Sequence, residues 1–171
     1  MIRSIPLFSL AFVVAALCSG CGANYTWKSS VPSELRTVCV PTFRNESDVS
    51  EAGAVATRQV LREIQREGTF SVRNPGEAAL EIQGVVKVVK LSVRAYDRAT
   101  EMRLRAYDVS AVVEVSVVDK RRRKVLVDNR KYRPTVQATV GQDMATALRD
   151  VSGRLMDELA REVVDDLLNL K

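Results

Sequence analysis

Between residues 107 and 117, apolar and polar residues alternate more regularly than anywhere else in the chain. Such alternation predicts a β-strand with one face toward a core and the other toward water. The polar face, from Asp108 to Ser116, is interrupted only by Val112. The apolar face consists of Tyr107, Val109, Ala111, Val113, Val115 and Val117. We therefore expect this strand to lie in a sheet that is covered on one side only.

The segment 79–93 is predicted to be a second long strand, because its apolar residues alternate from Leu80 onward. The alternation slips out of phase before Leu91, which predicts a β-bulge near Val89-Lys90, and Gly84 is expected to ease a bend. Elsewhere the pattern predicts a strand at 36–43, a short strand or extended link at 70–73, a strand at 125–132 and a loop at 134–142.

Two further segments carry apolar residues at three- or four-residue steps, which is the spacing of an amphipathic helix. The first helix is predicted to begin at an N-cap, Ser50, and to end at about Glu67, before Gly68. The second begins at Asp143 and continues toward the C-terminus. Another face of the first helix carries three arginines at four-residue spacing, which we interpret as a solvated face: Arg58, Arg62 and Arg66.

In chain order these elements give the succession β-α-β-β-β-α. The apolar stripes of both helices need a partner, and the apolar face of the sheet supplies one. We therefore predict the α/β class (α+β type): a two-layer sandwich in which two helices pack on one face of a four-stranded mixed or antiparallel sheet. Pro41 is expected to end the first strand or to place it at an edge.

Composition is consistent with a soluble globular domain, since 46% of the residues are hydrophobic and 27% are charged. Histidine is absent, which removes His-based catalytic triads and His metal ligands. We therefore expect no enzyme, no cofactor and no metal site. Cys39 lies between two valines, so it is expected to be a buried small hydrophobic residue.

The N-terminal segment has the features of a bacterial lipoprotein signal peptide. Arg3 precedes an apolar run from Leu7 to Leu17. As a helix, this run of about 11 residues would cover roughly 16 Å, which is too short to span a bilayer. Ser19 and Gly20 are the small residues that signal cleavage requires, and Cys21 follows them directly. An ordinary signal peptide with incidental cysteines is the alternative.

The lipobox pattern implies that Cys21 carries a diacylglycerol thioether and an amide-linked acyl chain such as palmitate, which suffices for stable anchoring. No aspartate follows Cys21, so the mature chain is expected on the periplasmic side of the outer membrane, lipid-anchored. The net charge of +5 is mildly basic, yet nucleic acid is not an expected partner of such a chain. The chain is accordingly divided into a signal peptide at 1–20, a lipidated tether at 21–30 and a single α/β domain at 31–171.

Basic residues gather in two connections of the predicted sheet. One lies between the second and third strands and holds Arg94, Arg98, Arg103 and Arg105. The other is the continuous basic run from Lys120 to Lys124. In a meander these connections lie at opposite ends of the sheet, so we expect them to serve different partners. Arginine and lysine suit phosphate groups, while solubility and protection of a sheet edge are the alternative role of the run.

Several short motifs resemble the LptE family of lipopolysaccharide-assembly lipoproteins. They are Cys21-Gly22, Val31-Pro32, Val40-Pro41-x-Phe43-x-Asn45 and Gly141-Gln142-Asp143-Met144, together with the element order predicted above. The resemblance implies an outer-membrane lipoprotein that plugs the large β-barrel LptD, helps it to assemble, and with it inserts lipopolysaccharide into the outer leaflet. It also implies lipopolysaccharide binding at the loop position that Arg94 or Arg98 matches.

The chain departs from the family pattern in one respect. Family members carry a lysine in the loop before the last helix, whereas no lysine lies between Pro134 and Gln142, and Ala138 falls near the matching position. A second possibility is therefore retained, in which the chain plugs the barrel without itself binding lipopolysaccharide. An activator of a peptidoglycan synthase also stays open, although its tether would normally be longer and richer in proline. The third class, an envelope hydrolase, is disfavoured by the absence of histidine.

Overall fold

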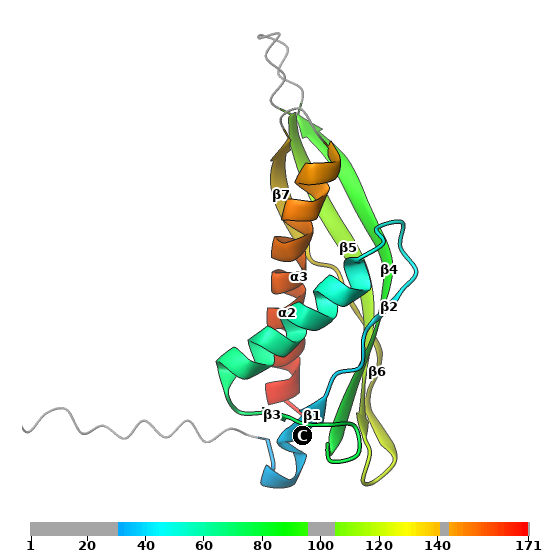
Figure 1. Ribbon diagram of the computed structural model, residues 1–171, viewed down its shortest axis with the longest axis vertical. Helices are drawn as coiled ribbons and strands as arrows, with labels where there is room; N and C mark the ends of the chain where they lie inside the picture. Colours follow the sequence, from blue (N-terminus) through cyan, green and yellow to red (C-terminus); the bar gives the residue numbers. More distant parts are fainter. Residues whose placement is uncertain (1–30, 96–104, 141–143, 171) are drawn as a thin grey trace, which may run out of the picture.

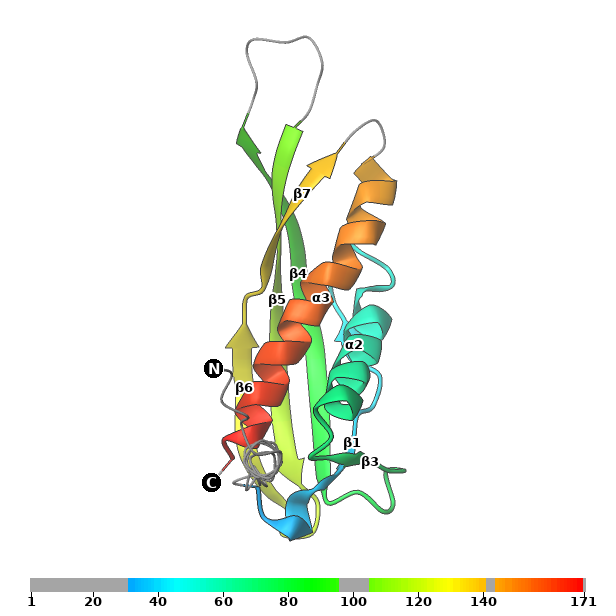
Figure 2. The same ribbon diagram turned by 90° about the vertical axis from the view of Figure 1, so that its left-hand side faces the viewer.

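A long twisted sheet and two helices that cover one of its faces make up the domain (Figures 1 and 2). The computed structural model describes residues 31–95, 105–140 and 144–170. The helices are the short 3-10 helix η2 (Ser33–Leu35), α2 (Ala52–Glu67) and α3 (Met144–Leu168). The strands are β1 (Thr37–Cys39), β2 (Arg44–Asn45), β3 (Ser71–Val72), β4 (Leu80–Ala95), β5 (Arg105–Asp119), β6 (Lys124–Tyr132) and β7 (Thr135–Val140).

In the described part of the chain, seven strands form one sheet in the order β3-β1-β4-β5-β6, with β2 added to β4 and β7 added to β5. β4 and β5 form the central antiparallel hairpin, and β1 and β2 pair with β4 in parallel. β6 and β7 share the other side of β5. The predicted class, a two-layer α+β sandwich with a mixed sheet, is confirmed, whereas the predicted number of four strands is wrong.

The additional strands come from segments whose pairing partners lie far away in the sequence. The predicted strand at 36–43 is shortened to β1, because the chain leaves the sheet before Pro41 and pairs with β4 again only at Arg44, beyond the predicted range. The predicted loop at 134–142 is wrong, because it contains β7. β6 pairs only with the second half of β5, and β7 pairs with the first half, residues 105–110. The short strand or extended link predicted at 70–73 is confirmed, since it contains β3.

The inward face of β5 forms the centre of the core. All six of its predicted apolar residues are buried, and Val113 is fully inaccessible. The helices meet this face with aliphatic side chains that are at most 1% exposed: Val60, Ile64, Leu155, Leu159 and Leu167. Full burial of each such side chain contributes about 1.5–3 kcal/mol. The alternation along β5 therefore predicted the buried face correctly.

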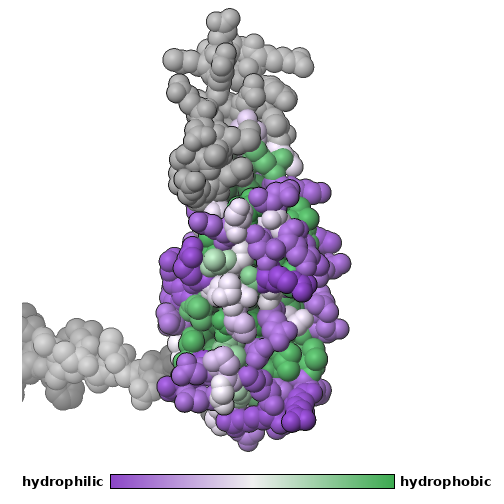
Figure 3. Space-filling view, turned by 45° about the vertical axis from the view of Figure 1, so that its right-hand side comes forward, coloured by the Kyte–Doolittle hydropathy of each residue, from purple (hydrophilic) through white to green (hydrophobic). Residues whose placement is uncertain are grey.

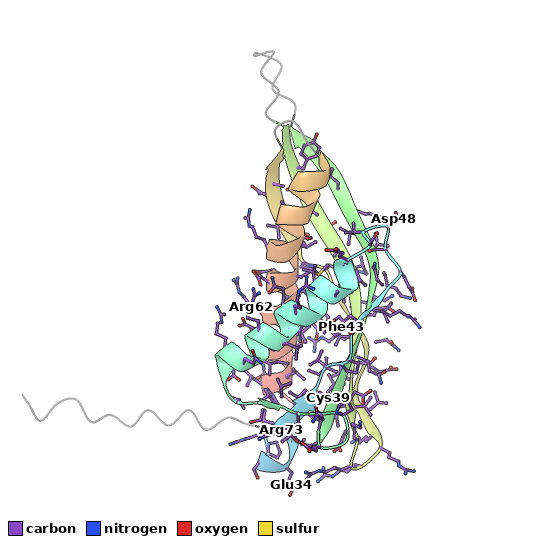
Figure 4. The ribbon with its side chains drawn as sticks, in the orientation of Figure 1. Glu34, Cys39, Phe43, Asp48, Arg62 and Arg73 are labelled. Carbon is purple, nitrogen blue, oxygen red and sulfur yellow. The ribbon has the colours of Figure 1, made fainter. Side chains whose placement is uncertain are left out.

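Helix α2 ends as predicted but begins later. Gly68 follows its last turn with a φ of 83°, the left-handed conformation that glycine adopts without steric cost. The first helical residue is Ala52 and the N-cap is Glu51, so the predicted N-cap Ser50 is wrong. The carbonyl of Ser50 accepts a hydrogen bond from Asn45 Nδ2 at 3.2 Å, which holds Ser50 in the preceding turn. The predicted solvated face is confirmed, since its three arginines are exposed: Arg58, Arg62 and Arg66. Figure 4 labels Arg62 on this helix.

Strand β4 shifts register against β5 between Val86 and Val88 and again between Val93 and Ala95. A bulge was expected from the phase change in the sequence, but its predicted position at Val89-Lys90 is wrong. The first shift occurs at Lys87, whose ammonium group reaches carboxylates on the uncovered face of the sheet. The sequence could not locate the shift, because valines occupy both faces of the strand between the two alternating stretches and fit a bulge at any of several positions.

Candidate functional site

The Val40-Pro41-x-Phe43-x-Asn45 motif fastens the sheet to α2. The ring of Phe43, which Figure 4 labels, is buried. It lies directly on Gly84 of β4, where a Cβ atom would overlap the ring. The Phe43 N–H donates a hydrogen bond to Thr57 Oγ1 at 2.9 Å, and that hydroxyl donates to the carbonyl of Gly53 at 2.8 Å. Gly84 is therefore needed for close packing, a role that the expectation of a bend missed.

Asn45, the last residue of the motif, organises the turn that leads into α2. Its Nδ2 donates to the carbonyls of Val49 at 2.8 Å and Ser50 at 3.2 Å. Its Oδ1 accepts from the backbone N–H of Ser47 at 3.1 Å and from the Ser47 hydroxyl at 2.7 Å. These bonds satisfy turn groups that have no partner in a helix or strand. The motif thus has a structural role: it places α2 against the sheet.

A row of alternating charges crosses the outer face of the sheet, which the helices leave uncovered. Glu46 pairs with Arg44 and with Lys87, each at 2.7 Å. Glu114 lies 3.8 Å from Lys87 and 3.5 Å from Lys131. The hydrogen bond between Glu46 and Lys87 lowers the pKa of Glu46 and raises the pKa of Lys87. Since partly exposed ion pairs stabilise a fold little, the row mainly gives this face a fixed charge pattern.

Valines lie on the same outer face beside the charge row. The register pairs Val88 with Val112 and Val118 with Val125, and places Val85 opposite Glu114. The side of the molecule drawn in Figure 3 accordingly shows hydrophobic residues among hydrophilic ones. The outer face therefore combines apolar side chains with fixed charges, a mixture that suits contact with another protein.

Of the two arginines matched to lipopolysaccharide binding, Arg94 belongs to the end of the β4–β5 hairpin. Arg94 is part of β4, next to the second register shift, while Arg98 lies outside the described residues, as does Cys21. This end of the hairpin lies opposite to the β5–β6 turn along the length of the sheet (Figure 1). The predicted placement of the two basic connections at opposite ends is thus in agreement with the strand order.

Ala138, the position matched to the family lysine, does not lie in a loop. It is 6% exposed on the inward side of β7, paired with Tyr107 of β5. A lysine in this place would bring its ammonium group into the core, so the sequence match at Ala138 is wrong. Among the β7 residues whose burial the structure describes, 135–138, Thr135 and Gln137 are exposed, and neither carries a charge.

A cleft of about 370 Å³ lies between β7 and α3. Two arginines and two carboxylates line this cleft, so its charges balance and favour neither an anion nor a cation. It is lined by Thr135, Val136, Arg154, Asp157, Glu158 and Arg161. Within the described ranges, no group of three or more His, Cys, Asp or Glu residues could hold a metal ion. The helices described here include none that is long and apolar enough to cross a membrane.

The opposite end of the sheet brings the basic run together with the first residues of the domain. Asp119 is 1% exposed, and its Oδ1 accepts the backbone N–H groups of Arg121 at 2.9 Å and Arg122 at 3.0 Å. The Arg122 guanidinium lies 3.6 Å from the carboxylate of Glu34 in η2. The run at 120–124 therefore forms a tight turn beside the point where residues 1–30 join the domain.

Cys39 lies behind this turn and is a packing residue, as predicted. It is 2% exposed, and its Sγ lies 3.8 Å from Oε2 of Glu81. Burial, and then the charge of Glu81, raises the pKa of the Cys39 thiol. Hydrogen bonds from Gln83 and then from Lys120 lower the pKa of Glu81. A thiol kept protonated beside a carboxylate is a poor nucleophile.

Comparison with known proteins gives one match to a family and several to folds. The model of the LptE family, described as lipopolysaccharide-assembly, matches residues 35–170. A candidate lipoprotein from Caulobacter crescentus CB15 has a TM-score of 0.52 at 13% identity, over 75% of this chain and 88% of its own. A hypothetical protein from Chlamydia trachomatis has a TM-score of 0.52 at 14% identity, over 78% of this chain and 96% of its own. At these identities the likeness shows the fold alone. No curated protein matches the chain.

Proposed function

The chain belongs to the LptE family of lipopolysaccharide-assembly proteins, and we propose that it is an outer-membrane lipoprotein that plugs and helps to assemble an LptD-type β-barrel. In this role it assists the insertion of lipopolysaccharide into the outer leaflet and is not an enzyme. The observation that carries the proposal is the extent of the family match, which covers residues 35–170 and so nearly the whole described domain.

The length of the central hairpin supports a role as a plug. β4 has 16 residues, which span roughly 50 Å at about 3.3 Å per residue. The apolar band of an outer-membrane barrel is about 25 Å tall, and the interior of such a barrel is polar. The hairpin is therefore long enough to cross the lumen from rim to rim. The charge row and valines of the outer face would meet the barrel wall.

The two ends of the domain suit the two sides of such a barrel. Glu34 and Arg73 mark the end at which residues 1–30 join the domain (Figure 4). A lipid on Cys21 would hold this end at the periplasmic surface. The end of the hairpin that carries Arg94 and Arg98 would then lie in the lumen, where arginine side chains can bind the phosphates of lipopolysaccharide.

The lipid anchor is tested by Cys21→Ala. We expect the overproduced variant, in excess over the barrel, to leave the membrane fraction after a high-salt wash, because a chain with neither acyl groups nor a bound barrel has no strong membrane attachment. Cell fractionation measures this, and mass spectrometry of the wild-type chain measures the acyl groups. An unmodified Cys21 in salt-washed membranes would overturn the lipoprotein assignment.

Direct binding of lipopolysaccharide is tested by neutralising Arg94 and Arg98 together with glutamine. We expect weaker binding in a titration and a more permeable outer membrane, with the barrel still associated. A hydrogen bond to a charged group is worth roughly 1.5–3 kcal/mol, so the loss of two should lower the affinity by well over tenfold.

The matched control removes more charge from elsewhere on the domain, through Arg58→Gln, Arg62→Gln and Arg66→Gln on the solvated face of α2. Equal loss of affinity in both variants would mean that bulk charge, not the hairpin end, attracts lipopolysaccharide. No loss in either would exclude direct binding by this chain and leave only the plug.

The plug itself is tested by co-purification from detergent-solubilised outer membranes. We expect a large β-barrel protein to elute with the tagged chain. Recovery of a peptidoglycan synthase in its place would support the alternative role as an activator of that enzyme. Recovery of neither protein would contradict both.

A further inference from the structure

The end of the domain at which residues 1–30 join it presents several unpaired cations. Arg121, Arg123 and Lys124 of the β5–β6 turn are exposed, and no carboxylate pairs with them among the residues that the structure describes. Glu34, an exposed acidic residue at this end, is already paired with Arg122. The exposed Glu77 follows Pro75 by two residues, and the carbonyl of Pro75 accepts a hydrogen bond from Lys120. The tip of the turn therefore keeps a positive surface.

An exposed apolar side chain lies directly beside these cations. Val125 follows Lys124 and is 50% exposed, and in the described part of the chain it is the one large hydrophobic residue left so open to solvent. It pairs with Val118 on the outer face of the sheet. Cations next to an exposed apolar residue are typical of protein surfaces that contact membranes, where the cations meet phosphates and the apolar group enters the head-group layer.

The alternative role, protection of a sheet edge, does not account for the turn. The edge strand β6 carries its own charges of both signs, including Asp128, Arg130 and Lys131, which already discourage pairing with another chain. The turn carries one sign only. Its Arg123 has a φ of 50°, a left-handed conformation in which glycine or asparagine would be less strained. The tip of the turn thus carries an arginine at a position where the backbone favours glycine or asparagine.

The length of chain between Cys21 and the domain keeps the turn close to the membrane. The ten residues at 21–30 reach at most about 35 Å when fully extended. Glu34, four residues further along, is in contact with Arg122 of the turn. A short tether gives a high effective concentration at its target, so even weak contacts between the turn and lipid are occupied.

We propose that the basic turn at 120–124, together with Val125, is a docking surface for the anionic phospholipid head groups of the leaflet that holds the lipid anchor. The inference rests on the proposed anchor at Cys21. Docking of the turn would hold this end of the domain at the depth of the lipid head groups, where the periplasmic rim of a barrel also lies. The β4–β5 hairpin can then extend across the thickness of the membrane within the lumen.

The test uses the mature chain, residues 21–171, with Cys21→Ser so that no acyl group contributes. Binding is measured by co-sedimentation with vesicles of equal parts phosphatidylethanolamine and phosphatidylglycerol, and with vesicles of phosphatidylcholine. The turn variant is Arg121→Gln, Arg123→Asn and Lys124→Gln, in which asparagine suits the left-handed position. The matched control is Arg58→Gln, Arg62→Gln and Arg66→Gln, which removes the same charge from the solvated face of α2. Melting temperatures confirm that both variants fold.

We expect the wild type and the α2 control to bind the anionic vesicles at low salt and to bind phosphatidylcholine poorly. Each basic residue near an anionic surface contributes about fivefold to binding, so the turn variant should bind roughly a hundredfold more weakly. Val125→Asn should weaken binding less, and its effect should persist at high salt.

Equal binding of the turn variant and the wild type would overturn the proposal, as would equal loss in the turn variant and the α2 control. Loss of barrel co-purification without any change in vesicle binding would also overturn it, since the turn would then contact a protein. The vesicles contain neither barrel nor lipopolysaccharide, so their result is independent of whether the chain is a plug.

Discussion

Val113→Asp is expected to unfold the domain or to bring it close to unfolding. Val113 is fully buried on the inward face of β5, between Val86 of β4 and Tyr132 of β6. An aspartate there would place an unpaired carboxylate in an apolar environment, at a cost of several kcal/mol. Since small domains are stable by about 5–15 kcal/mol, this is a large fraction of the total. Thermal or urea unfolding followed by circular dichroism measures the loss.

The matched control is Ser110→Asp on the outer face of the same strand. Ser110 is partly exposed and pairs with Lys90 and Thr135, so a carboxylate there stays hydrated and faces a cation. We expect a change of about 1 kcal/mol or less. Equal melting temperatures for the two aspartate variants would mean that the faces of β5 are assigned wrongly.

Gly84→Val is expected to destabilise the domain by about 3 kcal/mol or more, close to the cost of losing a buried phenylalanine. Valine is a good strand residue, so its backbone preference would favour the change. The obstacle is steric, because the ring of Phe43 occupies the space of the new Cβ. If the ring moves away, the hydrogen bond from the Phe43 N–H to Thr57 is also strained. Urea unfolding measures the effect.

Two further variants isolate the clash with Phe43. Gly76→Val is the control, since a Cβ at Gly76 meets nothing within 4 Å, and we expect a small effect. Phe43→Ala alone should cost about 3–5 kcal/mol through the cavity that it leaves. Combined with Gly84→Val it should cost clearly less than the two changes added together, because the valine fills part of that cavity. Strict additivity would contradict direct packing of the ring on Gly84.

These variants also separate structure from function in the motif that carries the family resemblance. Phe43 and Asn45 are held inside the fold by α2 and β4, so changes there should lower the amount of folded protein. Changes at Arg94, Arg98 or the basic turn should leave the amount of folded protein unchanged and alter binding. A loss of lipopolysaccharide assembly is therefore attributable to a contact only after the melting temperature has been measured.

The hydrophobic pattern of the sequence by itself determined the layers of this protein. The period of two along 107–117 predicted the buried face of β5, and three- to four-residue steps predicted α2 and α3, because alternation of side chains is a local property of the backbone. The glycine stop at Gly68 was also predictable, since the left-handed conformation belongs to a single residue. The element order, with its short motifs, indicated the family that the family model then matched over residues 35–170.

Tertiary structure decided what depends on neighbours distant in the sequence. β7 pairs with the first half of β5, which β6 leaves without a partner on that side. The alternation of apolar and polar residues at 135–140 is a local signal of this strand, but the choice of its partner depends on the fold. The same pairing buries Ala138, so a position matched to a loop lysine lies in the core. Gly84 is required because Phe43, about forty residues earlier, packs on it. The proximity of the basic turn to the start of the domain is likewise set by the fold, which brings Arg122 within 3.6 Å of Glu34. Such contacts arise only when the chain folds, because they are made between segments whose separation along the sequence says nothing about their separation in space.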